Sequence, residues 1–443
     1  MYSVILGIYF ILLHIFFPPF LSSGTKNAID TFIADPLTYW WFIFPLIGLI
    51  TLLILIIYYG RYFLASFGRG YRTKTPYYAN ISILIASKNE KPLLERTLNS
   101  IFASEYPKEK IQIIIITSGS TDGTTEYCKR FTKENDTINI EILSESLPKK
   151  GKPTALNYGL KYVKNEIVVL YDSGCILEPD TLRNLISPFR KEKNDAVIGP
   201  VLVKNYKTNK LTRGIFLDYA FLSGGGLLFE AKNRLGKSAF SYGRNFAVRT
   251  KYLKKYGGFN EDSMTEDLYL SVLLNLDGVK IFFSPKARVY EYVPSTWEIL
   301  KKQRTRWIAG YISDMPELMA MKNEDKDGKK IIIDRNMTMM LLGNMDTWIP
   351  IFIGFAIFFL LIGEFYLLIW FLSCLVFQFG FLFNAVRKYG DHHYGILLLF
   401  LVSGYIHLYM FLRQFSLPKE ISWEKTSTIL EKEEKEVKAL SII

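Results

Sequence analysis

The sequence predicts an α/β domain with a mainly parallel sheet and helices on both of its faces, inserted between transmembrane helices. The first observation is a series of short runs rich in Ile and Val in the middle of the chain, separated by segments with helical spacing. The second is the presence of long apolar runs near both ends of the 443 residues. Strand, helix and strand in repeated order favour a parallel sheet, and runs of roughly 20 apolar residues are long enough to cross a bilayer.

Two apolar runs begin the chain. Residues 1–21 hold no Asp, Glu, Lys or Arg, and residues 38–59 form a second run of spanning length. The first run lacks the basic start and small-residue exit of a signal peptide, so we expect it to remain as a span. Because Arg61, Arg69 and Arg72 follow the second run, the middle of the chain is expected in the cytosol.

A third apolar block, about 337–386, is long enough for two spans with a turn near Gly363, and residues 395–412 make a further one. That odd count would put the charged, amphipathic tail outside the cell, whereas its composition is typical of a cytosolic segment. We therefore expect one apolar piece to be interfacial or re-entrant. The expected organisation is two spans in 1–60, a cytosolic catalytic domain in 61–295, interfacial helices in 296–336, C-terminal spans in 337–414 and the tail in 415–443.

The composition excludes some functions. A net charge of +12 is explained better by basic flanks facing anionic membrane lipids than by nucleic acid, which we do not expect as a partner. Cys128, Cys175 and Cys374 have no metal-like spacing and suit a reducing compartment. Usage rich in Ile, Lys and Tyr suits a multi-pass protein of a prokaryotic plasma membrane.

Four apolar runs, each 6–8 residues long, are expected as buried strands: 81–87, 111–117, 167–172 and 196–203. Between the first two, residues 91–105 place apolar side chains at helical spacing. In parallel sheets of this kind, ligands bind at the carboxyl ends of the strands.

Three of these strands lead into polar turns of small residues, at 86–90, 118–124 and 172–174. Since the carboxyl ends of parallel strands meet at one edge, we expect the turns to open on one crevice. Ser120 and Thr121 could instead cap the next helix. Taken by itself, the second turn is therefore either a ligand site or a helix cap.

Two further segments suit a charged ligand. In LPKKGKPTALNYGL (147–160), a glycine flanked by lysines precedes a helical run and can offer N–H groups and ammonium charge to a phosphate. A solvated lysine cluster is the alternative. The acidic residues between Glu261 and Asp267 head an amphipathic helix; they are either ordinary N-terminal charges or include a general base.

The segment KKQRTRWIAGY (301–311) is expected as a helix. Gln303 lies four residues before Trp307 and Arg304 three before it, so these side chains cluster. Arg304 and Arg306 can hold phosphate oxygens, and Trp307 offers a ring on which a sugar stacks. Anchoring at lipid head groups is the alternative for the same residues.

Six motifs follow one another in order: SKNE, SGSTDGT, GKPTALN, DSG, TED and QRTRW. This order resembles the membrane-integrated family 2 glycosyltransferases, inverting enzymes of GT-A fold that include hyaluronan, chitin and cellulose synthases and lipid glycosyltransferases. The resemblance covers about residues 76–312, and the flanking spans also fit it.

The resemblance implies transfer of a sugar from a nucleotide-sugar donor to a lipid or glycan acceptor at the cytosolic membrane face. It implies Asp267 as the general base, with Glu266 and Trp307 on the acceptor side, and positive charge that stabilises the leaving diphosphate. The donor-binding residues that it implies are Glu90, Lys152, Asp172, Gln303, Arg304, Arg306 and Trp307. Processive polysaccharide synthesis and a non-catalytic, membrane-anchored nucleotide- or glycan-binding module are the alternatives.

The sequence departs from the family pattern at two places. Thr117 and Ser118 stand where the family commonly has an acidic pair. Gly174 replaces the second carboxylate of the Asp-x-Asp turn, which removes an oxygen ligand of the kind that Mg²⁺ or Mn²⁺ prefers. Asp172 remains as the one expected metal ligand, so the need for either ion is in question.

Overall fold

In the computed structural model of the protein, the described residues are 60–68, 70–71, 75–144, 146–147, 151–191, 194–320, 322–324, 330–332, 365–390 and 394–413, with a few single positions elsewhere. The spans expected at 1–21 and 38–59, most of the apolar block before residue 365, and nearly all of the charged tail lie outside these residues.

A seven-stranded sheet forms the centre of the α/β body, with strand order β3-β2-β1-β4-β8-β6-β9. Every neighbouring pair is parallel except those that β8 makes with β4 and β6. The strands are β1 (Ile81–Ala86), β2 (Ile111–Ile116), β3 (Asn139–Leu143), β4 (Ile167–Leu170), β6 (Ala196–Ile198), β8 (Phe246–Arg249) and β9 (Ile281–Phe283). The mainly parallel sheet is confirmed, and β3, β8 and β9 are additions to the expected strands.

The central strands are apolar throughout because both faces of the sheet are covered. All six residues of β2 are buried, as are the four of β4, which is typical of strands packed between two layers. On one face lies α6 (Lys152–Leu160), where a Cβ at Gly159 would come within 2.7 Å of Ile116. Small size at Gly159 therefore lets the helix sit directly on the sheet.

The run 196–203 is not the single strand that its apolar character predicts. It divides into β6 and β7 (Val201–Val203) at Gly199-Pro200, because proline has no N–H for a ladder and a Cβ at Gly199 would lie 2.0 Å from a neighbouring carbonyl oxygen. The chain then enters a second, three-stranded sheet of order β5-β10-β7. Its other strands are β5 (Ile176–Leu177) and β10 (Val289–Glu291).

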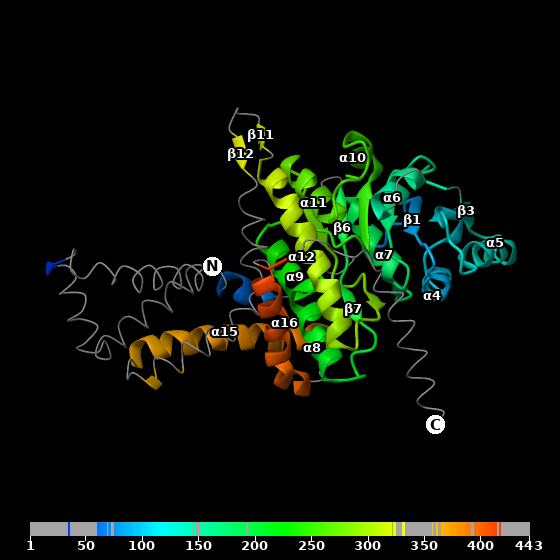
Figure 1. Ribbon diagram of the computed structural model, residues 1–443. Coiled ribbons are helices and arrows are strands. Elements are labelled where there is room, and N and C mark those ends of the chain that lie inside the picture. The colour runs from blue at the N-terminus through cyan, green and yellow to red at the C-terminus, as the bar shows by residue number, and fades with distance from the viewer. Residues whose placement is uncertain are drawn as a thin grey trace, which may run out of the picture.

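Helices surround the two sheets. Those beside the seven-stranded sheet include α4 (Lys91–Phe102), α5 (Thr124–Glu134), α7 (Thr181–Ile186), α10 (Thr250–Lys255) and α11 (Glu266–Leu276). In Figure 1, α8 (Lys210–Asp218), α9 (Leu227–Arg234) and α12 (Trp297–Ala320) lie between this region and the C-terminal helices α15 (Phe365–Tyr389) and α16 (Phe400–Arg413). After α12, within the stretch 296–336 where interfacial helices are expected, two short strands, β11 (Lys322–Glu324) and β12 (Lys330–Ile332), pair antiparallel.

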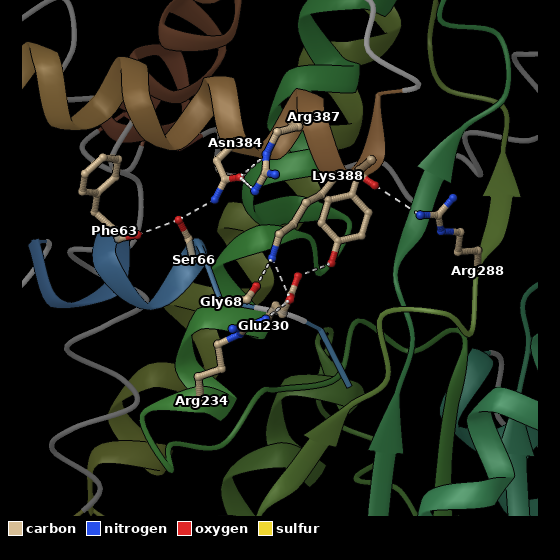
Figure 2. A network of polar contacts seen from close by, with 10 residues as sticks. Phe63, Ser66, Gly68, Glu230, Arg234, Arg288, Asn384, Arg387 and Lys388 are labelled. Carbon is tan, nitrogen blue, oxygen red and sulfur yellow. Dashed lines mark hydrogen bonds and ion pairs between the residues drawn. The ribbon is translucent and has the colours of Figure 1, made fainter. Parts of the chain in front are cut away.

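A buried carboxylate, Glu230 of α9, joins segments from both ends of the chain (Figure 2). Its oxygen Oε1 lies 2.6 Å from Arg234 and 2.8 Å from Nζ of Lys388 on α15, while the hydroxyl of Tyr389 donates to Oε2 at 3.1 Å. Lys388 also donates to the carbonyl of Gly68, at 3.1 Å. We call these five residues the Glu230 hub.

A second contact fixes α15 against the helix at residues 60–66. The amide of Asn384, which is fully buried, donates to the hydroxyl of Ser66 at 2.8 Å, and Arg387 donates to the same amide's oxygen (Figure 2). The segment after the second N-terminal apolar run and α15 are thereby held side by side on the α/β body.

The C-terminal helices expose apolar side chains. Leu372 and Val376 of α15 are 45% and 68% exposed, and Leu401 and Leu412 of α16 are 54% and 56% exposed. Close approach of α16 to α8 depends on Gly214, where a Cβ would lie 2.4 Å from Val402. Among the described residues, none of the helices combines the length and the apolar character needed to cross a membrane.

We expect Glu230→Gln to lower the free energy of unfolding by roughly 3 kcal/mol, because it leaves the buried ends of Arg234 and Lys388 without their counter-charge. Glu134→Gln is the matched control, since Glu134 forms a 4.0 Å pair with Arg130 in which both side chains are 63% exposed. Thermal unfolding of both variants checks this; equal melting temperatures would contradict the structural role of the hub.

Candidate functional site

The first two strand-end turns are tied to each other. The side-chain oxygen of Asn89 accepts from the N–H of Thr121 at 2.7 Å, and the N–H of Asn89 donates to the hydroxyl of Ser120 at 3.2 Å. Asn89 has a φ of 56°, a left-handed conformation that asparagine tolerates. The expected meeting of these turns at one edge is confirmed.

Ser120 and Thr121 do not cap the following helix. The N–H of Thr124, at the start of α5, donates instead to Asp122 at 3.0 Å, and Asp122 also accepts from the N–H of Lys91 at 3.2 Å. Asp122 thus accepts from the first N–H of α5 and joins α5 to α4, which leaves Ser120 and Thr121 as links between the turns.

Each of the three turns carries a buried hydroxyl. Ser87, Ser118 and Ser173 have side-chain oxygens that are shielded from solvent and find no hydrogen-bond partner among the described residues. Buried hydroxyls are normally satisfied by protein, water or ligand. Three of them at one sheet edge mark it as a place where a polar molecule is expected.

Lys152, the first residue of α6, is the electrostatic centre of this edge. Its Nζ lies 2.7 Å from Oδ1 of Asp172 and 3.3 Å from Oε1 of Glu266, and it donates to the carbonyl of Gly243 at 3.3 Å. An ammonium has three N–H donors, so all three are used. Burial alone would lower the pKa of Lys152, but the carboxylates of Asp172 and Glu266 outweigh it and raise the pKa above its ordinary value.

Asp267 stands beside Glu266 in the first turn of α11. Its Oδ1 accepts from the N–H of Leu268 at 2.8 Å. Burial and the neighbouring carboxylate of Glu266 raise the pKa of Asp267 to about 7, against the opposing influence of Lys152. A carboxyl with a pKa near neutrality can accept a proton at physiological pH.

Gly243, in the segment before β8, packs its backbone against these groups. Its φ is 72°, and a Cβ at this position would lie 3.0 Å from Oδ2 of Asp267 and 3.0 Å from Nζ of Lys152. Both the conformation and the space therefore require glycine here.

Arg244 is a site residue that the sequence does not single out. It is buried and makes a 2.8 Å ion pair with Glu291 of β10, whose carboxylate also accepts from the hydroxyl of Tyr219 at 2.7 Å. Burial works against its charge, but Glu291 first, followed by Tyr219 and Asp172, raises the pKa of Arg244 above its ordinary value. The sequence gives only a weak signal for Arg244, a basic residue after a glycine in YGRNFAVR. Its partner Glu291 lies 47 residues further along the chain.

The helix α12 divides the expected donor-binding residues into two groups. Arg304 is only 1% exposed and pairs at 2.7 Å with Asp218 of α8, which is fully buried. Its guanidinium is also stacked 4.3 Å from the ring centre of Trp307. The buried guanidinium of Arg304 thus has a structural partner, because a charge in the interior needs a counter-charge. Its contact with a donor stays a prediction.

Arg306 belongs to the other group. Burial lowers the pKa of Arg306, and the carboxylates of Asp172 and Glu266 act in the opposite direction, so its charge interacts with the same centre as that of Lys152. Gln303 and Trp307 are half-buried on the same helix. Glu90 caps the start of α4, where its carbonyl accepts from the N–H of Leu94 at 2.9 Å.

The residues that could hold a divalent cation are few. Within the described part of the chain, histidine, cysteine and carboxylate side chains form no group of three that could hold a metal ion. At Gly174 the φ is 97° and a Cβ would face Leu93 of α4 at 3.5 Å, so this turn is built for glycine. Asp172 alone fits as a protein ligand, the pattern of Mg²⁺ sites that use one carboxylate and substrate phosphates.

Comparison with known proteins gives matches over this same region. The model of the family described as "Glycosyltransferase like family 2" matches residues 79–310. The probable glycosyltransferase YdaM of Bacillus subtilis is 30% identical over 234 residues, which are 52% of this chain and 54% of that protein. The poly-beta-1,6-N-acetyl-D-glucosamine synthase of Staphylococcus epidermidis is 32% identical over 233 residues, with the same coverage of 52% and 54%. The match thus spans about half the length of these relatives.

Among solved structures, the mannosyltransferase PcManGT from Pyrobaculum calidifontis, in complex with GDP-Man and Mn²⁺, has a TM-score of 0.52 at 18% identity. The similarity covers 82% of this chain and 94% of that one. It supports the GT-A-like fold with a mainly parallel central sheet.

We expect Gly243→Ala to destabilise the protein more than Gly236→Ala. Both glycines have a φ of 72°, which costs an alanine about 1–2 kcal/mol, but a Cβ at Gly236 meets nothing within 4 Å. Crowding against Asp267 and Lys152 should add roughly 1–3 kcal/mol at Gly243. Denaturant unfolding of the two variants measures the difference, and equal losses would mean that the site relaxes around the new methyl group.

Proposed function

The chain belongs to glycosyltransferase family 2 and is a glycosyltransferase, and we propose that it transfers a sugar, with inversion, from a nucleotide-sugar donor to a lipid or glycan acceptor at the cytosolic membrane face. The observation that carries this proposal is Asp267, a carboxyl whose pKa is raised to about 7 beside the Lys152–Asp172 pair. A general base and a cationic centre at one sheet edge are what the reaction requires.

In the proposed reaction, Asp267 removes the proton of an acceptor hydroxyl. The hydroxyl oxygen forms a bond to the anomeric carbon of the sugar, and the bond from that carbon to the donor's diphosphate oxygen breaks on the opposite face. The electron pair leaves with the nucleoside diphosphate. Burial and the carboxylate of Glu266 keep the pKa of Asp267 raised. We assign Glu266 and Trp307 to the acceptor side.

The leaving diphosphate gains negative charge, so cations near it lower the barrier. Lys152 and Arg306 are the proposed partners, with Glu90 and Gln303 at the border of the donor site. Because all three donors of Lys152 already have partners, a phosphate oxygen must replace one of them. The carbonyl of Gly243 and Glu266, both at 3.3 Å, are the longer contacts and the ones we expect to give way.

We assign a divalent cation, Mg²⁺ or Mn²⁺, to Asp172. The structure of PcManGT is a complex of that protein with both GDP-Man and Mn²⁺. Such an ion, when bound, supplies charge neutralisation of the diphosphate. With Gly174 in place of a second carboxylate, we expect its affinity to depend on the donor phosphates more than in an Asp-x-Asp site.

The membrane part of the proposal rests on the C-terminal helices. Val376 on α15, Leu398 in the 3₁₀ helix Tyr394–Leu399 and Leu412 on α16 expose between 56% and 81% of their surface. Exposed apolar side chains gathered on neighbouring helices suit contact with lipid tails. We propose a multi-pass protein of a prokaryotic plasma membrane whose acceptor is brought to the site along that surface.

Processive synthesis of a polysaccharide is the second candidate. The similarity to a poly-beta-1,6-N-acetyl-D-glucosamine synthase favours it. The length of the products separates the two candidates, because single transfer gives one added sugar and processive synthesis gives long chains while most acceptor is still unused.

The proposal is tested with purified full-length protein in detergent or lipid nanodiscs, incubated with a panel of nucleotide sugars and membrane lipids. We expect one donor to be consumed, with the sugar recovered on a lipid or glycan and with inverted anomeric configuration. Absence of both transfer and donor hydrolysis over the whole panel would overturn it.

Asp267→Asn is expected to reduce turnover by about 10²–10⁴-fold, the usual contribution of a general base, while the affinity for nucleotide remains. Asp262→Asn is the matched control, because Asp262 is an exposed acid of the same segment. Turnover and nucleotide binding are measured separately for each variant; unchanged turnover in Asp267→Asn would remove this residue as the base.

The pH dependence follows from the same group. Asp267 acts as a base only when ionised, and its pKa is raised to about 7. The rate at limiting substrate should therefore fall about tenfold per pH unit below about 7 and level off above it. A profile that stays flat down to about pH 5 would contradict the assignment of Asp267.

A further inference from the structure

We propose that Asn157 and Asp314 are positioning residues that hold the segment before Asp267 from two sides. We call residues 257–265, which lead from α10 into α11, the acid loop. One contact comes from α6, whose first residue is Lys152, and the other from α12, which carries Arg306. This inference rests on the proposed role of Asp267 as the base.

Asn157 holds the beginning of the acid loop. Its amide oxygen accepts from the N–H of Phe259 at 2.7 Å, and its amide nitrogen donates to the carbonyl of Phe259 at 2.9 Å, so it binds the backbone as a neighbouring strand would. At Gly258 the φ is 101°, and a Cβ would lie 2.2 Å from Oδ1 of Asn157. The glycine thus lets the loop pass directly against this side chain.

Glu261 strengthens the same contact. Its Oε1 accepts from the amide of Asn157 at 2.9 Å, and its Oε2 accepts from the hydroxyl of Thr154 at 2.9 Å. Both partners lie on α6, about one turn apart. Lys152 begins the same helix, and α6 packs closely on the sheet at Gly159. The beginning of the acid loop is therefore attached to the helix that carries Lys152.

Asp314 holds the end of the acid loop. Its Oδ2 accepts from the hydroxyls of Ser263 and Thr265, both at 2.5 Å, and Ser263 in turn accepts from the N–H of Thr265 at 3.0 Å. Asp314 is only 6% exposed. Thr265 precedes α11 directly, so Asp314 fixes the residue from which the helix bearing Asp267 starts.

Asp314 shares one face of α12 with Arg306. Arg306, Gly310 and Asp314 are four residues apart, the spacing at which side chains lie above one another on a helix. At Gly310 a Cβ would lie 2.7 Å from the side chain of Thr265. The face of α12 that carries a proposed diphosphate ligand therefore also carries the contact to the acid loop.

Placement of the base is sensitive to such contacts. A shift of about 1 Å in a reacting group can cost on the order of 10²-fold in rate without loss of binding. The hydrogen bonds of Asn157 and Asp314 go to residues of the acid loop, and not to the carboxylate of Asp267. Their effect on the reaction would pass through the backbone of the loop, which distinguishes positioning from catalysis.

The test compares Asp314→Ala, Asp314→Asn and Asn157→Ala with Glu298→Gln in the full-length protein. Glu298 lies in the first turn of α12, is exposed and pairs at 3.2 Å with Lys302 of the same helix. We expect kcat to fall by about 10–100-fold in Asp314→Ala and Asn157→Ala, with nucleotide affinity unchanged. Asp314→Asn, which keeps one acceptor oxygen, should recover part of the rate, and Glu298→Gln should behave as the unmodified protein.

A double-mutant cycle gives the decisive readout. If Asp314 acts through Thr265, the losses in Asp314→Ala and Thr265→Val should not multiply in the double variant. Thr265→Val keeps the shape of the helix start and so remains informative where Asp314→Ala is unstable. Unchanged kcat in Thr265→Val and Asp314→Asn, in a protein whose unmodified form is active, would overturn this inference alone; an inactive unmodified protein would instead overturn the proposed function.

Discussion

A sheet whose central strands are buried on both faces is the constraint on which the rest of this structure depends. Every residue of β2 and β4 is buried, so these strands offer almost no polar side chain to solvent along their length. Charged and hydroxyl groups gather at the strand ends, and parallel strands end at the same edge. The turn at Asn89, the turn at Ser120 and the turn at Asp172 are close together for this reason, whatever ligand they bind.

The second layer of organisation is electrostatic. The Arg304–Asp218 pair fixes α12 on α8 at almost zero exposure, and the Glu230 hub fixes α15 on α9. A buried ion pair contributes less to stability than to a defined arrangement, because one partner alone in the interior is strongly unfavourable. In this protein the two pairs define how the helices that carry Arg306 and the apolar C-terminal surface are oriented relative to the sheet.

Much of the catalytic body can be predicted from the sequence, and the exceptions have physical causes. β1, β2 and β4 are predictable because long Ile and Val runs have few other stable arrangements. The division at Gly199-Pro200 is hard to foresee because both halves are apolar and only the proline marks a break. The structural role of Arg304 is hidden because its partner Asp218 lies 86 residues away, and spacing along one helix gives no information on such a partner. The role of Asp314 cannot be predicted for the same reason, since its partners Ser263 and Thr265 lie 51 and 49 residues away in the sequence.

The fully used ammonium of Lys152 has a consequence for selectivity. The crevice carries its own counter-ions, Asp172 and Glu266, so in the absence of donor it has little excess positive charge with which to attract anions. A small anion that offers one weak contact cannot compete with two carboxylates already in place. The proposed donor, a diphosphate joined to a sugar and a nucleoside, would add contacts at the strand-end turns that compensate for the ion pairs that it displaces. On the proposed function, the ion pairs of the empty site would therefore favour the complete donor over free phosphate.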